Sequence, residues 1–178
     1  ENKDTEISFY QTGQAELLIN NSDWKVVIPK TEEAAIYFGR NTRWCTSAKT
    51  DNYFSHYNND GPLYIILEKK TNKRWQFHFE SAQFMDEKDD RISNSVITKI
   101  IRSTGMKTDF LDKNGSLLRI LTDPTEEEKL KALKCNGNSI RYIRNPSKEM
   151  QIIAFNSGHD PSDIIQLIYR PCEEAQII

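Results

Sequence analysis

Residues 124–137 read PTEEEKLKALKCNG, residues 146–158 read PSKEMQIIAFNSG and residues 171–178 read PCEEAQII. Each segment opens on a proline, and the prolines lie 22 and 25 residues apart. The residues before each proline are also alike, reading LLRILTD, IRYIRN and IQLIYR. Self-similarity at this period is typical of stacked helical arrays, so the sequence predicts an α-helical, solenoid-like repeat over residues 101–178.

The repeat carries local signals for the start and end of each helix. Proline is tolerated at the first helical position, where its missing N–H would have no partner in any case. Asp123 and Asn145 precede two of the prolines and are expected to cap the helices that follow. Gly137 and Gly158 are expected to end those helices by entering the left-handed region of backbone conformation.

Apolar residues recur at matching positions and predict the buried stripe of each repeat helix. The matching sets are Leu130, Ile152 and Ile177; Ala132 and Ala154; and Leu133 and Phe155. Each helix is too short to bury its stripe alone, so neighbouring units are expected to stack. The LLRILTD stretch predicts a degenerate unit that begins before residue 118. Because the last segment is short and the chain starts without methionine, we expect a longer parent protein.

Residues 1–100 have a different pattern, which predicts a small α+β domain. Thr31 is placed to cap a helix over residues 32–38, which Gly39 ends. A second helix is expected near residues 95–102, where it bridges into the repeats. The expected strands are residues 22–28, 63–68, 74–80 and 83–85, with turns at 70–73 and 86–90. We therefore expect a small antiparallel β-meander with one or two helices packed on one face, and leave 41–60 as a polar, irregular stretch.

The strand at residues 74–80 alternates most cleanly. Trp75, Phe77 and Phe79 fall on one face, and the polar residues between them, His78 among them, fall on the other. This alternation predicts an apolar face against the core and a polar face in solvent.

Composition and charge narrow the class of protein. With 28% charged and 37% hydrophobic residues, the chain has the composition of an ordinary soluble globular protein. Residues 1–100 hold 13 basic and 15 acidic side chains, and residues 101–178 hold 11 of each. This even balance argues against duplex nucleic acid as a partner. No apolar run reaches membrane-spanning length, so no membrane association is expected.

The three cysteines are widely spaced and lack any C-x-x-C pairing. This pattern argues against a disulfide framework or a zinc site and favours the reducing cytoplasm. The acidic stretch at residues 86–90 lacks the glycine and the spacing of a calcium loop. We therefore expect neither a metal site nor a cofactor.

Four motifs in the first domain carry a resemblance to a known group of proteins. They are W-x-V-x-x-P-x-T-x-E-A-A at residues 24–35, G-x-x-T-x-W-C-T at 39–46, Y-F-x-x-Y at 53–57 and G-P-L-Y at 61–64. With QFHFES at 76–81 and Asp86, they resemble uncharacterised proteins of bacteriophages and large DNA viruses. The N-P-S-x-E at 145–149 is similar to short helical arrays in viral and bacterial proteins of unknown role. These resemblances imply a phage or mobile-element origin and bring no activity with them.

One set of residues fits cysteine-dependent chemistry. Cys45 follows Arg43 and precedes Thr46, whose hydroxyl and N–H groups can help to hold a thiolate. His78 can serve as the base, with Asp86 or Glu80 to orient its imidazole. The alternatives are that Cys45 packs in the core or lines a ligand site, and that His78 is a strand residue on a solvated face.

A second set fits binding. Arginine forks and aromatic rings gather within a short polar stretch, which is typical of sites for nucleotides or single-stranded nucleic acid. The candidate ligand-binding residues are Arg40, Arg43, Trp44, Thr46, Tyr53, His56, Tyr57 and Glu80. The alternative is that the tyrosines pack under the loop while the arginines face water.

Two functions follow from these sets. The preferred hypothesis is a binding protein of phage or mobile-element type in the host cytoplasm, whose partner is a host or phage protein or a nucleotide. The alternative is a small cysteine-dependent or nucleotide-handling enzyme in which Cys45 and His78 work together.

Overall fold

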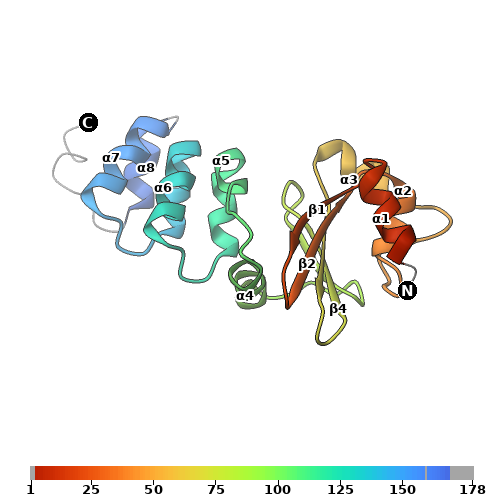
Figure 1. The fold of residues 1–178 in the computed structure, drawn as a ribbon. Helices are drawn as coiled ribbons and strands as arrows, with labels where there is room; N and C mark the ends of the chain where they lie inside the picture. Colours follow the sequence, from red (N-terminus) through yellow and green to blue (C-terminus); the bar gives the residue numbers. More distant parts are fainter. Residues whose placement is uncertain (1–2, 159, 169–178) are drawn as a thin grey trace. The chain divides into compact units, whose positions relative to one another are not determined.

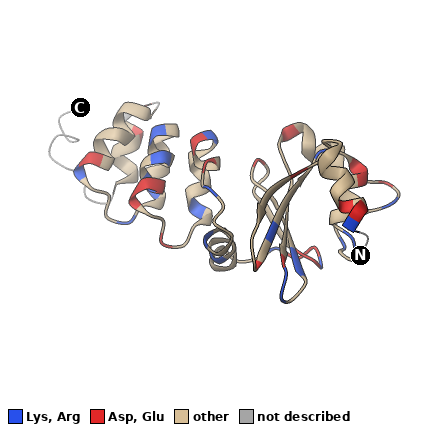
Figure 2. Ribbon diagram, in the orientation of Figure 1, with Lys and Arg blue, Asp and Glu red and all other residues tan. Residues whose placement is uncertain are grey.

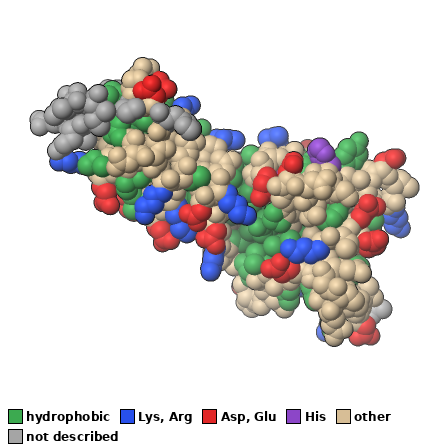
Figure 3. Space-filling view, turned by 90° about the horizontal axis from the view of Figure 1, so that it is seen from above, with side chains coloured by type: hydrophobic (Ala, Val, Ile, Leu, Met, Phe, Trp, Pro, Cys, Tyr) green, Lys and Arg blue, Asp and Glu red, His purple; other side chains and the backbone are tan. Residues whose placement is uncertain are grey.

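The computed structural model describes residues 3–158 and 160–168 (Figure 1). The chain divides into two compact units, residues 1–96 with 100–106 and residues 97–99 with 107–178. The division falls within helix α4 (Asn94–Thr104), which forms where a helix is expected at residues 95–102. Acidic and basic side chains are interspersed within each unit (Figures 2 and 3).

The N-terminal unit is built on a five-stranded antiparallel meander, which confirms the mixed α and β class. Its strands follow one another in sequence order across the sheet. They are β1 (Ala15–Asn20), β2 (Trp24–Pro29), β3 (Tyr64–Glu68), β4 (Lys73–His78) and β5 (Gln83–Asp86). Four of the five were expected; β1 was not, because its AELLIN stretch lacks the alternation of a half-buried strand.

Four helices accompany this sheet: α1 (Lys3–Gln11), α2 (Glu32–Phe38), the short 3₁₀ helix η1 (Cys45–Ser47) and α3 (Phe54–Asp60). Helix α2 forms as expected: the Thr31 side chain accepts from the N–H of Ala34, and the N–H of Gly39 donates to Ala35. The stretch 41–60, expected to be irregular, contains η1 and α3.

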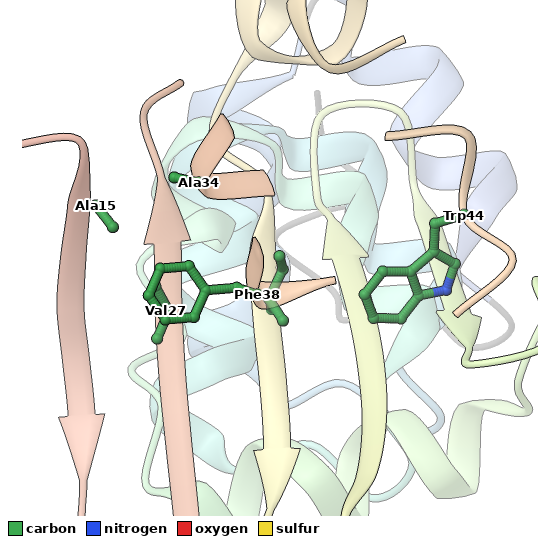
Figure 4. Close-up of a cluster of buried hydrophobic side chains, with 6 residues drawn as sticks. Ala15, Val27, Ala34, Phe38 and Trp44 are labelled. Carbon is green, nitrogen blue, oxygen red and sulfur yellow. The ribbon is translucent and has the colours of Figure 1, made fainter. Parts of the chain in front are cut away.

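A hydrophobic cluster lies between α2 and one face of the sheet (Figure 4). Val27 and Ile65 point into it from β2 and β3, and Phe38 and Trp44 close it from α2 and the loop that follows. Phe9 and Tyr10 of α1 pack against its margin. This cluster fixes the loop after α2, which carries the W-C-T motif, against the sheet.

The strand register assigns the two faces of β4. Phe77 lies opposite Tyr64 on β3 and Phe84 on β5, and the Phe77 and Phe84 ring centroids are 5.1 Å apart. The opposite face carries Arg74, Gln76 and His78, all of them buried. The expectation of a solvated polar face is therefore wrong, because this face is covered rather than open.

The C-terminal unit is helical. Its elements are α5 (Phe110–Lys113), η2 (Gly115–Ile120), α6 (Glu126–Cys135), η3 (Gly137–Tyr142), α7 (Lys148–Ser157) and α8 (Pro161–Leu167). Helices α6 and α7 contact each other, as do η2 and η3. The elements α5 and η2 occupy the place of the degenerate unit expected before residue 118. Pro171, Cys172 and Ile177 lie outside the described residues.

The caps of α6 and α7 differ from those expected. Thr125 and Ser147, one residue after each proline, accept hydrogen bonds from the first turn, so each proline lies just outside its helix. Asp123 and Asn145 have φ of 50° and 55° and do not cap. Short polar side chains tolerate this left-handed conformation, which lets the chain turn before the proline.

Gly137 also has a role that differs from the one expected. The described glycines with positive φ are Gly13 and Gly105, so Gly137 does not end α6 in the left-handed region. A Cβ added at Gly137 would lie 2.1 Å from the carbonyl oxygen of Ala154, and one added at Gly115 would lie 2.2 Å from that of Ala132. Each glycine thus lets the backbone approach the next α-helix closely, at positions 22 residues apart.

Within the described ranges, no helix combines the length and the apolar character needed to cross a membrane.

Candidate functional site

The W-C-T loop is held to the end of β5 by hydrogen bonds. The indole Nε1 of Trp44 donates to the carbonyl oxygen of Asp86 at 2.6 Å, and the N–H of Arg43 donates to Glu87 at 2.9 Å. Trp44 is only 2% exposed. Within the loop, the hydroxyl of Thr42 donates to the carbonyl of Gly39 at 2.6 Å. The geometry therefore gives Trp44 a packing role and leaves it no surface for a ligand.

Thr46 also points into the protein. It is buried, and its hydroxyl donates a short hydrogen bond to Oε1 of Gln76 on β4. Asn52 donates to the Thr46 carbonyl oxygen at 3.0 Å. These bonds join the loop to the covered face of the sheet and use the hydroxyl that was expected to help hold a thiolate.

Cys45 is half-buried and lies near Tyr57 and Asp89. Burial raises the pKa of the Cys45 thiol, and the nearby carboxylate of Asp89 raises it further. Burial also raises the pKa of Tyr57, whose hydroxyl donates to Oε1 of Gln83 at 3.0 Å. A reactive thiolate needs a lowered pKa and an electropositive neighbourhood, so these surroundings favour the neutral thiol.

His78 is 1% exposed, and both of its ring nitrogens have partners. Nε2 lies 3.1 Å from the carbonyl oxygen of Tyr57 and 3.3 Å from that of Gly61. Nδ1 lies 3.2 Å from the N–H of Ser81 and 2.7 Å from its hydroxyl. Because carbonyls only accept and a backbone N–H only donates, the neutral ring must carry its proton on Nε2. In this state His78 ties the end of β4 to the turn after α3.

The two acidic candidates are placed differently. Oε2 of Glu80 lies 3.8 Å from Nε2 of His78. Asp86 lies opposite Trp75 in the β4–β5 register, whereas His78 lies opposite Gln83 at the other end. Oδ1 of Asp86 accepts from the N–H groups of Lys88 and Asp90, at 2.8 and 3.1 Å. Asp86 therefore holds the charged turn and does not orient His78.

The candidate ligand-binding residues are divided between several places. Tyr53 and His56 are exposed on α3, and the His56 ring meets the Tyr57 ring edge-on at 5.5 Å. Arg43 is exposed. Arg40 instead folds back: one of its guanidinium nitrogens donates to the carbonyl of Tyr37 at 2.6 Å, and its Cζ lies 4.5 Å from the Tyr37 ring centre. The structure therefore does not gather Arg40, Arg43 and the aromatic residues into one site.

Arg40 instead lines a hollow that the sequence did not reveal. Its lining comes from α1, β2, β3, β4 and the end of α2, and consists of Glu6, Lys25, Val27, Phe38, Arg40, Ile65, Leu67 and Arg74. The only sequence signal for it is a charged residue in each of two otherwise covered strands, Lys25 in β2 and Arg74 in β4. Those two residues are far apart in sequence, so their proximity depends on the sheet register.

Comparison of the chain with protein-family models, with curated proteins and with solved structures found no match. The resemblance of the W-C-T motif to phage and viral proteins stays a prediction.

The pH dependence of Cys45 alkylation measures the state of this thiol. In a chain with Cys135→Ala and Cys172→Ala, the midpoint is expected above the ordinary thiol value of about 8.5, because burial and Asp89 disfavour the thiolate. Asp89→Asn should lower the midpoint by removing one of these causes, while Asp90→Asn serves as the matched control. A midpoint below about 7.5 that rises on His78→Gln would instead indicate a histidine-assisted nucleophile.

Proposed function

We propose that this chain is a non-catalytic binding protein whose C-terminal helices form a repeat array with a protein-binding surface. The observation that carries the proposal is the recurrence of one backbone contact, Gly115 against Ala132 and Gly137 against Ala154, at the period of the sequence repeat. A regular contact of this kind stacks each unit on the next and leaves an outer surface that continues from unit to unit.

The outer surface carries apolar side chains at equivalent positions. Leu130 and Ile152 match in the repeat, yet Leu130 is only half-buried and Ile152 is 41% exposed. The neighbouring pairs Ala132 with Ala154 and Leu133 with Phe155 are buried instead. An exposed apolar residue at a repeated position is typical of the contact surface of such an array. We propose that this surface binds a host or phage protein, in keeping with the sequence resemblance.

The state of the candidate catalytic groups supports binding over catalysis. Both ring nitrogens of His78 are used within the fold, and the pKa of Cys45 is raised. An enzyme that relies on this pair would need a lowered thiol pKa and a ring nitrogen directed at the thiol.

Photo-crosslinking tests the proposal. A crosslinking side chain at position 152 is expected to join the protein to one discrete partner in the cells that produce it. The same side chain at exposed Asn59 of the N-terminal unit should give no such product. Ile152→Ser should weaken capture of the identified partner at least tenfold, while the thermal midpoint changes little because the side chain is already partly in water. Capture that is unchanged by Ile152→Ser, or no discrete product from positions 130 and 152, would overturn it.

A further inference from the structure

The hollow beside α1 brings three cationic side chains together with one carboxylate. Lys25, Arg40 and Arg74 line it together with Glu6, and its other lining residues are apolar. Its volume is about 340 Å³, which includes space open to solvent. All of the lining belongs to the N-terminal unit, so this site is independent of the surface proposed above.

The sheet register explains how the cationic residues come to surround an apolar floor. Lys25 on β2 lies opposite Leu67 on β3, and Leu67 in turn lies opposite Arg74 on β4. Neighbouring strands are about 4.8 Å apart, so the backbones of Lys25 and Arg74 are separated by roughly 10 Å across this row. The next row along the helix-covered face places Val27 opposite Ile65. The hollow thus has an aliphatic floor and a cation on each side.

Burial strengthens the electrostatic effect. Arg74 is 6% exposed, and the side chains of Lys25 and Glu6 are 20% and 22% exposed. Nζ of Lys25 lies 2.6 Å from Oε1 of Glu6, so the one carboxylate of the lining is already engaged. Like charges repel more strongly where water is excluded, and an anion bound between them reduces that repulsion. Guanidinium groups also match the geometry of phosphate and carboxylate oxygens.

We propose that this hollow binds the phosphate or carboxylate group of a small ligand, held by Arg40, Arg74 and Lys25. Phe38 and the aliphatic floor contact the apolar part of such a ligand, which distinguishes the site from a cationic surface patch.

The test titrates the full chain with inorganic phosphate and separately with acetate, against chloride at equal ionic strength. Thermal unfolding followed by tryptophan fluorescence reports on this unit, because Trp24, Trp44 and Trp75 all lie in it. A saturable rise of the midpoint with either oxyanion is expected, and chloride should give none. A response to phosphate alone identifies a phosphate ligand, and a response to acetate alone identifies a carboxylate.

Variants separate the site from general salt effects. Arg40→Gln and Lys25→Gln are each expected to raise the Kd for the effective anion at least tenfold. Lys30→Gln is the matched control, because Lys30 forms an exposed pair with Glu16 at 3.1 Å. A response equal to that of chloride, or an affinity in both Arg40→Gln and Lys25→Gln that equals the Lys30→Gln value, would overturn the proposal.

Discussion

Replacing Trp44 with alanine is expected to lower the free energy of unfolding of the N-terminal unit by about 3–5 kcal/mol. The side chain is 2% exposed and shares a cluster with Val27 and Phe38, so the substitution leaves a cavity between α2 and the sheet (Figure 4). It also removes the donor that pairs with the carbonyl oxygen of Asp86. Leaving a buried acceptor unpaired adds to the loss.

Urea unfolding followed by the fluorescence of Trp24 and Trp75 measures this loss. Trp44→Phe keeps most of the ring volume and loses the hydrogen bond, so it should cost less than Trp44→Ala. Tyr53→Ala is the control, because Tyr53 is 56% exposed and its loss should change stability by no more than about 0.5 kcal/mol. If Trp44→Ala unfolds with the same midpoint as Tyr53→Ala, the loop does not depend on this cluster.

Replacing Gly137 with alanine is the second substitution with a large expected effect, on the C-terminal unit. The added Cβ would lie 2.1 Å from the carbonyl oxygen of Ala154 and 2.8 Å from the nitrogen of Gly158. Both are backbone atoms, so neither can turn aside as a side chain could. Overpacking of this kind costs about 1–3 kcal/mol, occasionally more, and we expect the upper part of that range.

Far-UV circular dichroism in urea measures the effect, since the helices of the C-terminal unit contribute to it. Gly115→Ala should behave alike, because its Cβ would lie 2.2 Å from the Ala132 carbonyl. Arg141→Ala is the control in the same 3₁₀ helix, where the exposed side chain should matter by no more than about 0.5 kcal/mol. A Gly137→Ala protein as stable as Arg141→Ala would show that the units do not approach each other as closely as the structure indicates.

Much of the local structure could be predicted from the sequence because its signals are local. The alternation around Phe77 predicted β4, and Thr31 and Gly39 predicted both ends of α2. Helix α1 and strand β1 were missed. No residue of α1 is buried, and β1 buries only Ala15 among its six residues, so neither shows the stripe on which such predictions depend.

The candidate site was harder to predict because it depends on contacts between distant residues. His78 was expected on a solvated face, since alternation separates two faces without showing which of them is covered. The hollow lined by Lys25, Arg40 and Arg74 was not predicted at all, because its members come from separate elements. Asp86 was expected beside His78, and only the β4–β5 register shows that they lie at opposite ends of the pairing.

The sequence by itself determined the periods: two residues in the strands, and about 22 residues between the prolines of the helical segments. Periodicity reflects the repeat geometry of the backbone, which each short segment carries within itself. The tertiary structure decided the rest. It brought Trp44 to Asp86, 42 residues away, placed a glycine of one segment against an alanine of the next, and covered the polar face of β4. Such contacts form only when separate elements meet in space, so no local pattern of residues specifies them.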